Sequence, residues 1–317
     1  MLAFSLSGFL LLLSVAGHVS AAQYSISDTF QGNDFLNNFD FFTDADPTNG
    51  YVNYVSKADA LAKDLVQVSG NNFTLRADDQ NVPSTSARGR DSVRITSQKA
   101  YNTHVSIYNV AHMPKGCGTW PAIWEVGNNW PNEGEVDIVE GTNLATANVA
   151  SLHTGPGCTV PPVRTQMTGN PLNNNCVSGA GSNAGCNVQL TAADSFGHPF
   201  NTNGGGIYAM ERASTGISIW FWARNDQNVP AEVANGAATI DTSTWGTADV
   251  VFPDTGCNIT NHFGNHNIVI NLTFCGDLAG ATYPTSGCPS TCQDFVQNNP
   301  GEFNWAFFSM MWIKVYE

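Results

Sequence analysis

Hydrophobic and polar residues alternate with a period of two along several segments of the chain. These segments are rich in β-branched and aromatic residues, as half-buried strands require. The clearest of them are 93–96, 104–108, 206–212, 217–224, 267–273 and 312–316. The four residues 213–216 between two of these segments suit a hairpin loop, whereas only 57–65 has a weakly helical pattern. Many short strands separated by turns predict an all-β, antiparallel sandwich.

One stretch, residues 155–200, departs from this pattern because Gly, Asn, Pro and Ser dominate it. A loop of this length within a compact domain is usually functional or disordered. Three embedded cysteines, Cys158, Cys176 and Cys186, favour an ordered excursion held by disulfides. We interpret it as the rim of a binding site, with a surface loop of no function as the alternative. No internal repeat or linker divides the rest, so we expect one domain over 23–317.

The first 22 residues have the pattern of a secretory signal peptide. An apolar run begins at Phe9, and small residues, 19–22, precede Gln23. The run is short for a bilayer span, so we expect a cleaved signal rather than an uncleaved anchor. No later segment is apolar enough to cross a membrane, and residues 313–317 do not form a lipid-anchor signal. We therefore expect a secreted, extracellular protein that does not associate with a membrane.

All 8 cysteines follow this segment, an even number for an oxidising compartment. Four disulfides are therefore possible, and the spacing leaves their connectivity open. A zinc site is the alternative, but the spacing of Cys288 and Cys292 has no second pair of ligands to match it, so we expect no metal. Sequons at Asn72, Asn258 and Asn271 are candidate glycosylation sites.

The chain is acidic and poor in charge. Charged residues make up 12% of its 317 residues, and the formal net charge is −14. This charge would repel nucleic acid and anionic membranes, whereas a neutral polymer is nearly indifferent to it. The composition therefore argues against nucleic-acid binding and favours a neutral ligand.

Four acidic residues within eight positions stand out in such a chain: Glu133, Glu135, Asp137 and Glu140. Strand-forming residues separate the last three. Alternate residues on a strand share a face, so Glu135 and Asp137 point the same way. A regular strand would turn Glu140 to the opposite face, but a β-bulge near 138–139 would return it to theirs. We predict three carboxyl groups on one surface.

Like charges on one face repel, and this repulsion lowers the stability of the fold unless a function compensates for it. The alternative is a solvated acidic face with no function. The repulsion allows one carboxyl group to stay protonated as an acid while another stays ionised as a nucleophile. On the bulged strand, Glu135 and Glu140 lie about four steps of ~3.3 Å apart. Their side chains can approach the ~5–5.5 Å of a retaining glycosidase rather than the ~6.5–9.5 Å of an inverting one. We therefore predict a glycosidase that retains the configuration at the anomeric carbon.

Residues 135–140, E-V-D-I-V-E, resemble the E-x-D-x-x-E signature of glycoside hydrolase family 16 in its bulged, laminarinase-type form. Segments 118–124, 151–158, 46–55 and 271–277 are similar to the secreted fungal branch of that family. The resemblance implies a concanavalin A-like β-jelly-roll sandwich whose concave sheet forms a glucan-binding cleft. It also implies an endo-acting, retaining β-glucanase on β-1,3 and mixed β-1,3/1,4 linkages.

Carried over position by position, the resemblance makes Glu135 the nucleophile and Glu140 the general acid and base, with Asp137 tuning and orienting the nucleophile. The expected substrate-binding residues are Arg94, Trp120, Trp124, Trp130 and His153. Core packing is the alternative for the tryptophans, a structural role for the histidine and a surface salt bridge for the arginine.

Two further positions concern the sugar contacts. Trp220 and Trp222 share one strand face, which is either a sugar platform or part of the core between the sheets. Leu278 stands where the family frequently has Trp, so a stacking contact of about 1 kcal/mol is absent at one subsite.

Two other functions remain open. A glucan transglycosylase that remodels cell walls would use the same residues with a sugar in place of water. A catalytically inactive lectin would be expected to lack one or both glutamates, and Glu135 and Glu140 are both present. The mechanism needs no cofactor; a structural calcium would suit the acidic surface, although no ligand set stands out. The expected partner is a neutral β-glucan, and the expected protein is a monomer.

Overall fold

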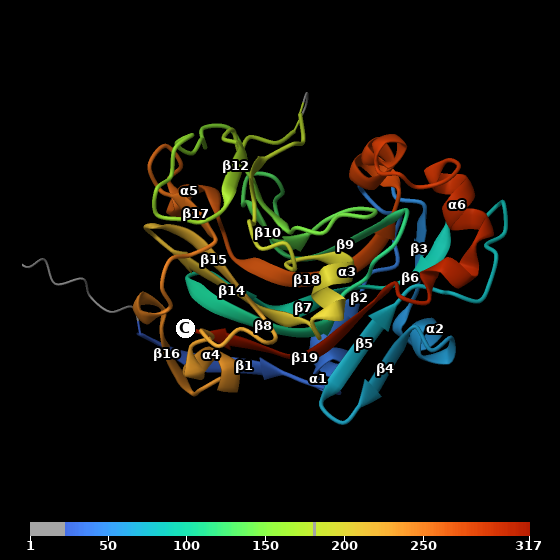
Figure 1. The fold of residues 1–317 in the computed structure, drawn as a ribbon, viewed down its shortest axis with the longest axis horizontal. Helices are drawn as coiled ribbons and strands as arrows, with labels where there is room; N and C mark the ends of the chain where they lie inside the picture. Colours follow the sequence, from blue (N-terminus) through green and yellow to red (C-terminus); the bar gives the residue numbers. More distant parts are fainter. Residues whose placement is uncertain (1–22, 180–181) are drawn as a thin grey trace, which may run out of the picture.

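Two large antiparallel sheets, packed face to face, form the body of the molecule (Figure 1). The computed structural model describes residues 23–179 and 182–317, so the expected signal peptide lies outside the described residues. The antiparallel sandwich predicted from the alternating segments is confirmed.

The eight-stranded sheet carries the acidic segment near its middle. Its strands lie in the order β12 (Asn170–Asn173), β13 (Cys186–Gln189), β11 (Val149–His153), β10 (Glu135–Glu140), β9 (Thr119–Gly127), β18 (His266–Phe274), β7 (Arg94–Tyr101) and β2 (Phe39–Phe41). Side chains on one face of β9, β10 and β18 point into the sandwich, and those on the other face line its outer surface.

The second sheet has nine strands. The order is β16 (Thr239–Asp241), β1 (Gln23–Phe30), β19 (Phe307–Tyr316), β8 (His104–His112), β14 (Gly206–Ala213), β15 (Gly216–Ala223) and β17 (Val250–Pro253), with β5 (Asn72–Arg76) beside β19 and β4 (Val66–Ser69) beside β5. Strands β14 and β15 form the predicted hairpin, with Ala213 opposite Gly216. A short parallel pair, β3 (Val52–Tyr54) and β6 (Arg90–Ser92), stands apart from both sheets.

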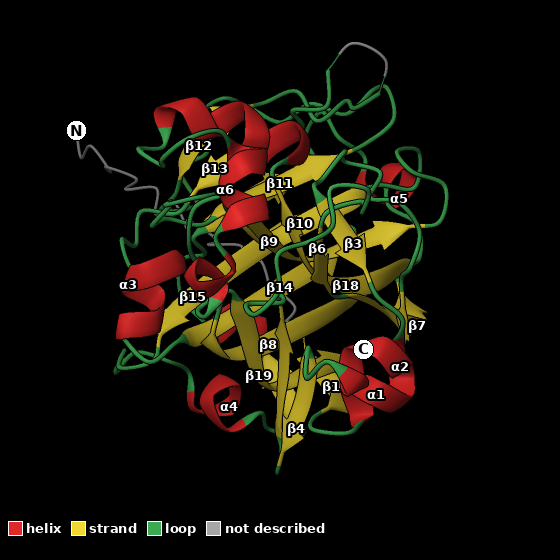
Figure 2. Ribbon diagram, turned by 90° about the vertical axis from the view of Figure 1, so that its right-hand side faces the viewer, coloured by secondary structure: helices red, strands yellow, loops and turns green. Residues whose placement is uncertain are grey.

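Short helices lie outside the sheets (Figure 2). They are α1 (Asp34–Asn38), α2 (Lys57–Ala62), α3 (Gly197–Thr202), α4 (Ala231–Asn235), α5 (Ile259–His262) and α6 (Cys292–Asn298), with single helical turns at Thr242–Thr244, Gly276–Gly280, Tyr283–Thr285 and Pro300–Phe303. Helix α2 begins where the weakly helical pattern does, and the Ser56 hydroxyl caps it by accepting from the Asp59 amide. Among the described residues, no helix has the length and apolar character needed to span a membrane.

The main core fills the space between the sheets. Ile123 and Val136 from the eight-stranded sheet, and Tyr208 and Met210 from the other, are completely buried in one apolar cluster. Burying apolar side chains of this size stabilises the fold by about 1.5–3 kcal/mol each. The cluster fixes the acidic strand from behind.

A second apolar cluster lies on the outer face of the nine-stranded sheet. Trp220 and Trp222 pack edge-on against Trp245, with ring centroids 5.2 and 5.8 Å apart. Both interpretations of this tryptophan pair were therefore wrong: it forms neither a sugar platform nor part of the core between the sheets. Phe221, which lies between the two tryptophans in the sequence, turns inward instead and lies 4.8 Å from the Tyr208 ring. The reason is that α4, β16 and the turn after them fold over this face and bury it.

The eight cysteines form four disulfides: Cys117–Cys288, Cys158–Cys257, Cys176–Cys186 and Cys275–Cys292. Two of these bonds hold the Gly- and Asn-rich excursion, one by closing a loop within it and one by tying it to the chain before α5. The interpretation of that stretch as an ordered excursion is confirmed for its described residues.

A buried carboxylate connects the two sheets. Glu125 on β9 is completely buried, and its Oε1 accepts hydrogen bonds of 3.0 Å from Ser106 and Tyr108 on β8. The Nε2 atom of His104 lies 3.0 Å from the same oxygen. Burial alone would raise the pKa of Glu125, but His104 and the Arg212 guanidinium lower it to about 2. The group is therefore ionised in the folded protein at neutral pH.

Replacing Glu125 with Ala should lower the free energy of unfolding by about 3–5 kcal/mol, because the buried Arg212 then loses its counter-charge. Urea unfolding at pH 7 measures the loss. Because the folded pKa lies below its ordinary value of 4.5, the stabilisation is complete above that pH and is lost as the pH falls toward 2. Glu302→Ala, at an exposed position, is the control; equal losses in the two variants would contradict the prediction.

Candidate active site

The acidic strand β10 contains the predicted β-bulge. Its register against β9 shifts between Asp137 and Val139, so Ile138 is the extra residue. Both Ile138 and Val139 are completely buried in the core. The extra residue returns Glu140 to the face that carries Glu135 and Asp137, as the sequence pattern required.

A single buried amide fixes this bulge. The Nδ2 atom of Asn148 donates to the Ile138 carbonyl at 2.8 Å, and its Oδ1 accepts from the Glu140 amide at 2.8 Å. The Ser195 hydroxyl accepts from the Asn148 backbone amide at 3.0 Å, which anchors this residue in turn. At the bulge, the Ile138 carbonyl and the Glu140 amide therefore both have a buried hydrogen-bond partner.

His153 lies directly opposite Glu135 on the neighbouring strand β11. Its Nε2 atom is 3.2 Å from Oδ2 of Asp137 and 4.0 Å from Oε1 of Glu135. One side-chain atom from each of the three residues lies within 4.8 Å of the others, a spacing that a metal ion could also use. Asp137 is only 3% exposed, whereas Glu135 is partly open to solvent.

All three carboxyl groups have raised pKa values. Burial and then the charge of Asp137 raise the pKa of Glu135, while burial and the charge of Glu140 raise that of Asp137. Burial also raises the pKa of Glu140, against an opposing hydrogen bond from Trp120. The group therefore retains protons at a pH where isolated carboxyl groups have lost theirs, so a proton donor and an ionised carboxylate can stand side by side.

Two tryptophans of β9 flank the carboxyl groups. Trp120 donates from Nε1 to Oε1 of Glu140 at 2.8 Å. Trp124 lies opposite Asp137 in the sheet, and its Nε1 donates to Oδ1 of Asn271 at 2.8 Å. Both indoles are half-buried, so each has a polar anchor and a partly exposed ring.

Arg94 reaches this surface from β7. Its guanidinium carbon lies 5.0 Å from the Trp124 ring centroid and 4.5 Å from that of Phe42. The stacking on Trp124 holds the cation over β9, the strand next to β10, which carries the carboxyl groups.

The structure thus brings most of the predicted residues onto one face. Trp130 stands somewhat apart, on the turn that joins β9 to β10, with 39% of its surface exposed. This turn leads into β10 at Glu135. Leu278, in the helical turn after Cys275, is also exposed, at 38%.

Sequence reasoning missed the residues that hold the others in place. Asn148 has no local signal, and the sequence places Asn271 in a predicted strand, in a family-like segment and in a sequon, none of which indicates a contact with Trp124. The Asn271 side chain is 7% exposed and also donates to the Tyr54 hydroxyl at 3.1 Å, so it is a poor glycosylation site. Asn258, by contrast, is exposed.

Comparisons with known proteins agree with this geometry. A family model described as the XgeA-like catalytic domain of glycoside hydrolase family 16 matches residues 39–316. A probable glycosidase of Schizosaccharomyces pombe is 38% identical over 94% of this chain and 70% of its own length. An endo-1,3(4)-beta-glucanase of Arthroderma benhamiae is 38% identical over 97% of this chain and 68% of its own. A probable endo-1,3(4)-beta-glucanase of Aspergillus niger is 39% identical over 98% of the chain, but the chain spans only 42% of that relative.

Solved structures give the same picture. Laminarinase 16A from Phanerochaete chrysosporium, with β-glucans in its donor and acceptor sites, superposes with a TM-score of 0.91 at 50% identity, over 93% of this chain and 100% of its own. An elongating family 16 β-1,3-glucosyltransferase superposes with a TM-score of 0.86 at 38% identity, over the same shares. The predicted jelly-roll fold is confirmed by these neighbours.

Proposed function

Since this chain belongs to glycoside hydrolase family 16, we propose that it is an endo-acting, retaining β-glucanase that hydrolyses β-1,3 and mixed β-1,3/1,4 glucans. One observation carries the proposal most strongly. Glu135 and Glu140 stand on one face of a bulged strand, with the almost completely buried Asp137 between them. Two carboxyl groups of this kind are what a double displacement at a sugar carbon requires.

In the first step, Glu140 donates its proton to the glycosidic oxygen while the Glu135 carboxylate attacks the anomeric carbon. The glycosidic bond breaks as the new carbon–oxygen bond forms, which gives a glycosyl-enzyme. In the second step, Glu140, now ionised, takes a proton from water, and this water releases the sugar from Glu135. The Trp120 N–H bond to Glu140 orients the acid and stabilises it once it is ionised.

Asp137 has the role of tuning the nucleophile. It is the most buried of the three carboxyl groups and is therefore the one in which a charge costs most. We assign a proton to Asp137, which donates it in a hydrogen bond to Glu135 and keeps that neighbour ionised. His153, with Nε2 facing both carboxyl groups, can bind a sugar hydroxyl.

The substrate is proposed to be a neutral β-glucan. Sugars present apolar faces and polar rims, which suit the partly exposed indoles of Trp124 and Trp130 and the Arg94 guanidinium stacked on Trp124. The formal charge of −14 does not oppose a neutral polymer. Similarity to a laminarinase with β-glucans in both sites points to the same substrate class.

We propose further that the protein acts as a secreted monomer after removal of residues 1–22, with residues 23–317 as one catalytic domain. The four disulfides support an oxidising destination. Transglycosylation is the second candidate, because an elongating glucosyltransferase shares the fold at 38% identity. The intact acid and nucleophile positions make a lectin the weakest of the three.

Time-resolved proton NMR of the purified protein with a soluble β-1,3-gluco-oligosaccharide tests the proposal. We expect the β-anomer to appear first, with the α-anomer following at the rate of mutarotation in an enzyme-free control. Products longer than the substrate would identify a transglycosylase. An early α-anomer would contradict retention, and a lack of product from β-1,3 and mixed-linkage glucans would overturn the substrate assignment.

A further inference from the structure

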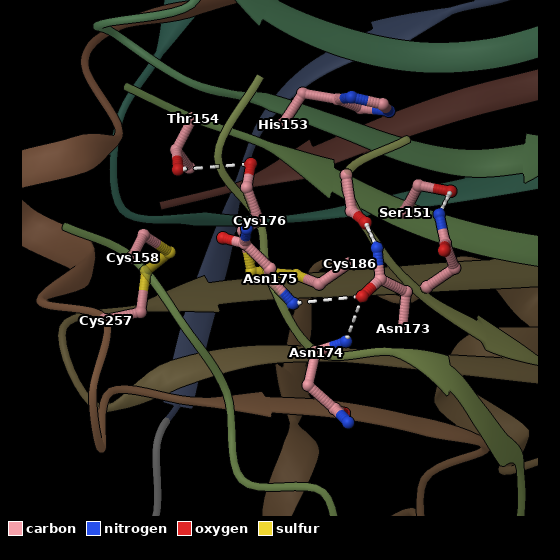
Figure 3. Close-up of a disulfide and its surroundings, with 12 residues drawn as sticks. Ser151, His153, Thr154, Cys158, Asn173, Asn174, Asn175, Cys176, Cys186 and Cys257 are labelled. Atoms are coloured by element: carbon pink, nitrogen blue, oxygen red, sulfur yellow. Dashed lines mark hydrogen bonds between the residues drawn. A yellow bond between two sulfur atoms is a disulfide. The ribbon is translucent and has the colours of Figure 1, made fainter. Parts of the chain in front are cut away.

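The loop closed by the Cys176–Cys186 disulfide is attached to β11 on both sides of His153 (Figure 3). On one side, Cys186 lies opposite Leu152 in the pairing of β13 with β11. On the other side, the Thr154 amide donates to the Cys176 carbonyl at 2.8 Å. The disulfide therefore joins the two cysteines that pair with the neighbours of His153 on either side.

Two residues of this loop contact the imidazole itself. The Ser178 hydroxyl lies 2.9 Å from Nδ1 of His153, and Ser178 is only 6% exposed. Gly185 packs against the edge of the ring: a Cβ at this position would lie 2.8 Å from Cε1 and 2.9 Å from Nδ1. The Gly185 backbone also has a φ of +62°, which glycine adopts without strain. The ring is held at one nitrogen and along one edge.

These contacts decide which nitrogen faces the carboxyl groups. With Nδ1 bonded to Ser178, Nε2 points at Asp137 and Glu135, 3.2 and 4.0 Å away. A neutral imidazole that donates from Nδ1 to the serine presents a lone pair at Nε2, which can accept the proton held among these carboxyl groups.

We propose that the two described arms of the loop closed by the Cys176–Cys186 disulfide, residues 176–179 and 182–186, are a positioning element of the active site, in which Ser178 and Gly185 fix the ring orientation and tautomer of His153. The part that concerns turnover rests on the function proposed above, whereas the effect on the imidazole does not. Ser178 is a positioning residue, because it acts on the substrate and the reacting atoms only through the histidine.

The loop is anchored well enough to do this. The Asn173 side chain donates to the Gly185 carbonyl at 2.6 Å, and the Ser178 amide donates to the Thr154 carbonyl at 2.9 Å. The disulfide joins Cys176 and Cys186 at a sequence separation of 10, so the arms that carry Ser178 and Gly185 are tied together before any substrate arrives. A preformed contact of this kind costs nothing at the moment of binding.

Ser178→Ala tests the proposal through the histidine. In the parent, we expect the ¹⁵N spectrum of the imidazole to show one dominant His153 tautomer, and in the variant a mixture of two. We expect kcat/KM on β-1,3-glucan to fall about tenfold to a hundredfold, with a displaced pH profile. Ser178→Thr, which keeps the hydroxyl group, should restore the parental spectrum and profile.

Ser182→Ala is the matched control, because this hydroxyl belongs to the same loop and accepts from the Ala184 amide instead. We expect it to keep the parental spectrum. A second perturbation, Cys176→Ala with Cys186→Ala, should produce the same His153 change as Ser178→Ala.

Parental ¹⁵N signals and an unchanged pH profile in both the serine and the cysteine variants would overturn the proposal. The spectra are recorded without glucan, so a failure of the proposed glucanase activity would leave this result readable. A loss of activity in Ser178→Ala with an unchanged tautomer would also overturn it, since the serine would then act by another route.

Discussion

Replacing Glu135 with Gln is expected to reduce kcat on β-1,3-glucan by about 10⁴–10⁶-fold. The amide has nearly the same shape as the carboxylate but cannot attack the anomeric carbon, so no glycosyl-enzyme forms. Binding should survive, because the partly exposed indoles and Arg94 are untouched. Release of reducing ends measures the first effect, and calorimetric titration with a laminari-oligosaccharide measures the second.

The fold of this variant should be at least as stable as that of the parent. Burial raises the pKa of Glu135, so an ionised group at this position is disfavoured, and a neutral amide avoids the cost of burying a charge there. Glu133→Gln is the matched control, because Glu133 lies two residues earlier and, within the described part of the chain, its side chain accepts a hydrogen bond from the Asn129 amide in the turn. If Glu135→Gln turned over glucan as fast as this control, another residue would be the nucleophile.

Glu140→Gln should reduce kcat on β-1,3-glucan by about 10²–10⁴-fold, because the leaving oxygen no longer receives a proton. The loss should be much smaller in the first step with an aryl glycoside whose phenol is a good leaving group. Azide, which needs no base to attack, should accelerate the second step and give a glycosyl azide. Comparing the two substrates with and without azide separates the acid role from the base role.

The pH dependence of the parent follows from the same residue. Burial raises the pKa of Glu140 from its ordinary value of 4.5, so the acid keeps its proton, and the enzyme its activity, to a higher pH than an exposed glutamate would allow. The alkaline limb of kcat/KM should therefore lie above that value and should disappear in Glu140→Gln with the aryl substrate. An unchanged alkaline limb in this variant would assign it to another group.

The acidic strand could be predicted from the sequence because its geometry is local. The alternation along β10 placed Glu135 and Asp137 together, and the need to bring Glu140 to them required one extra residue, which the structure has at Ile138. The same period of two predicted the hairpin of β14 and β15. The period of the hydrophobic pattern and the length of a turn are local features, so they predict strand faces and hairpins even when distant contacts are unknown.

The residues that hold the site could not be found in this way. Ser178 reaches His153 across 25 positions, and Asn271 reaches Tyr54 across 217. An isolated serine or asparagine has no periodic signal that reveals such a partner. Trp220 shows the same limit, since alternation gives its face but not the segment that covers that face.

The strand β19 has a consequence for the order of folding. It lies between β1 and β8 in the nine-stranded sheet and also pairs with β5. In its pairing with β1, Tyr316 lies opposite Ile26, so the two partners are separated by most of the chain. Until β19 has been synthesised, three strands made much earlier each lack a neighbour. Contacts so distant in sequence form slowly, and unpaired strand edges favour aggregation in the meantime. The chain should therefore emerge from the ribosome without a completed sheet, and its long-range disulfides, Cys117–Cys288 and Cys158–Cys257, should form late.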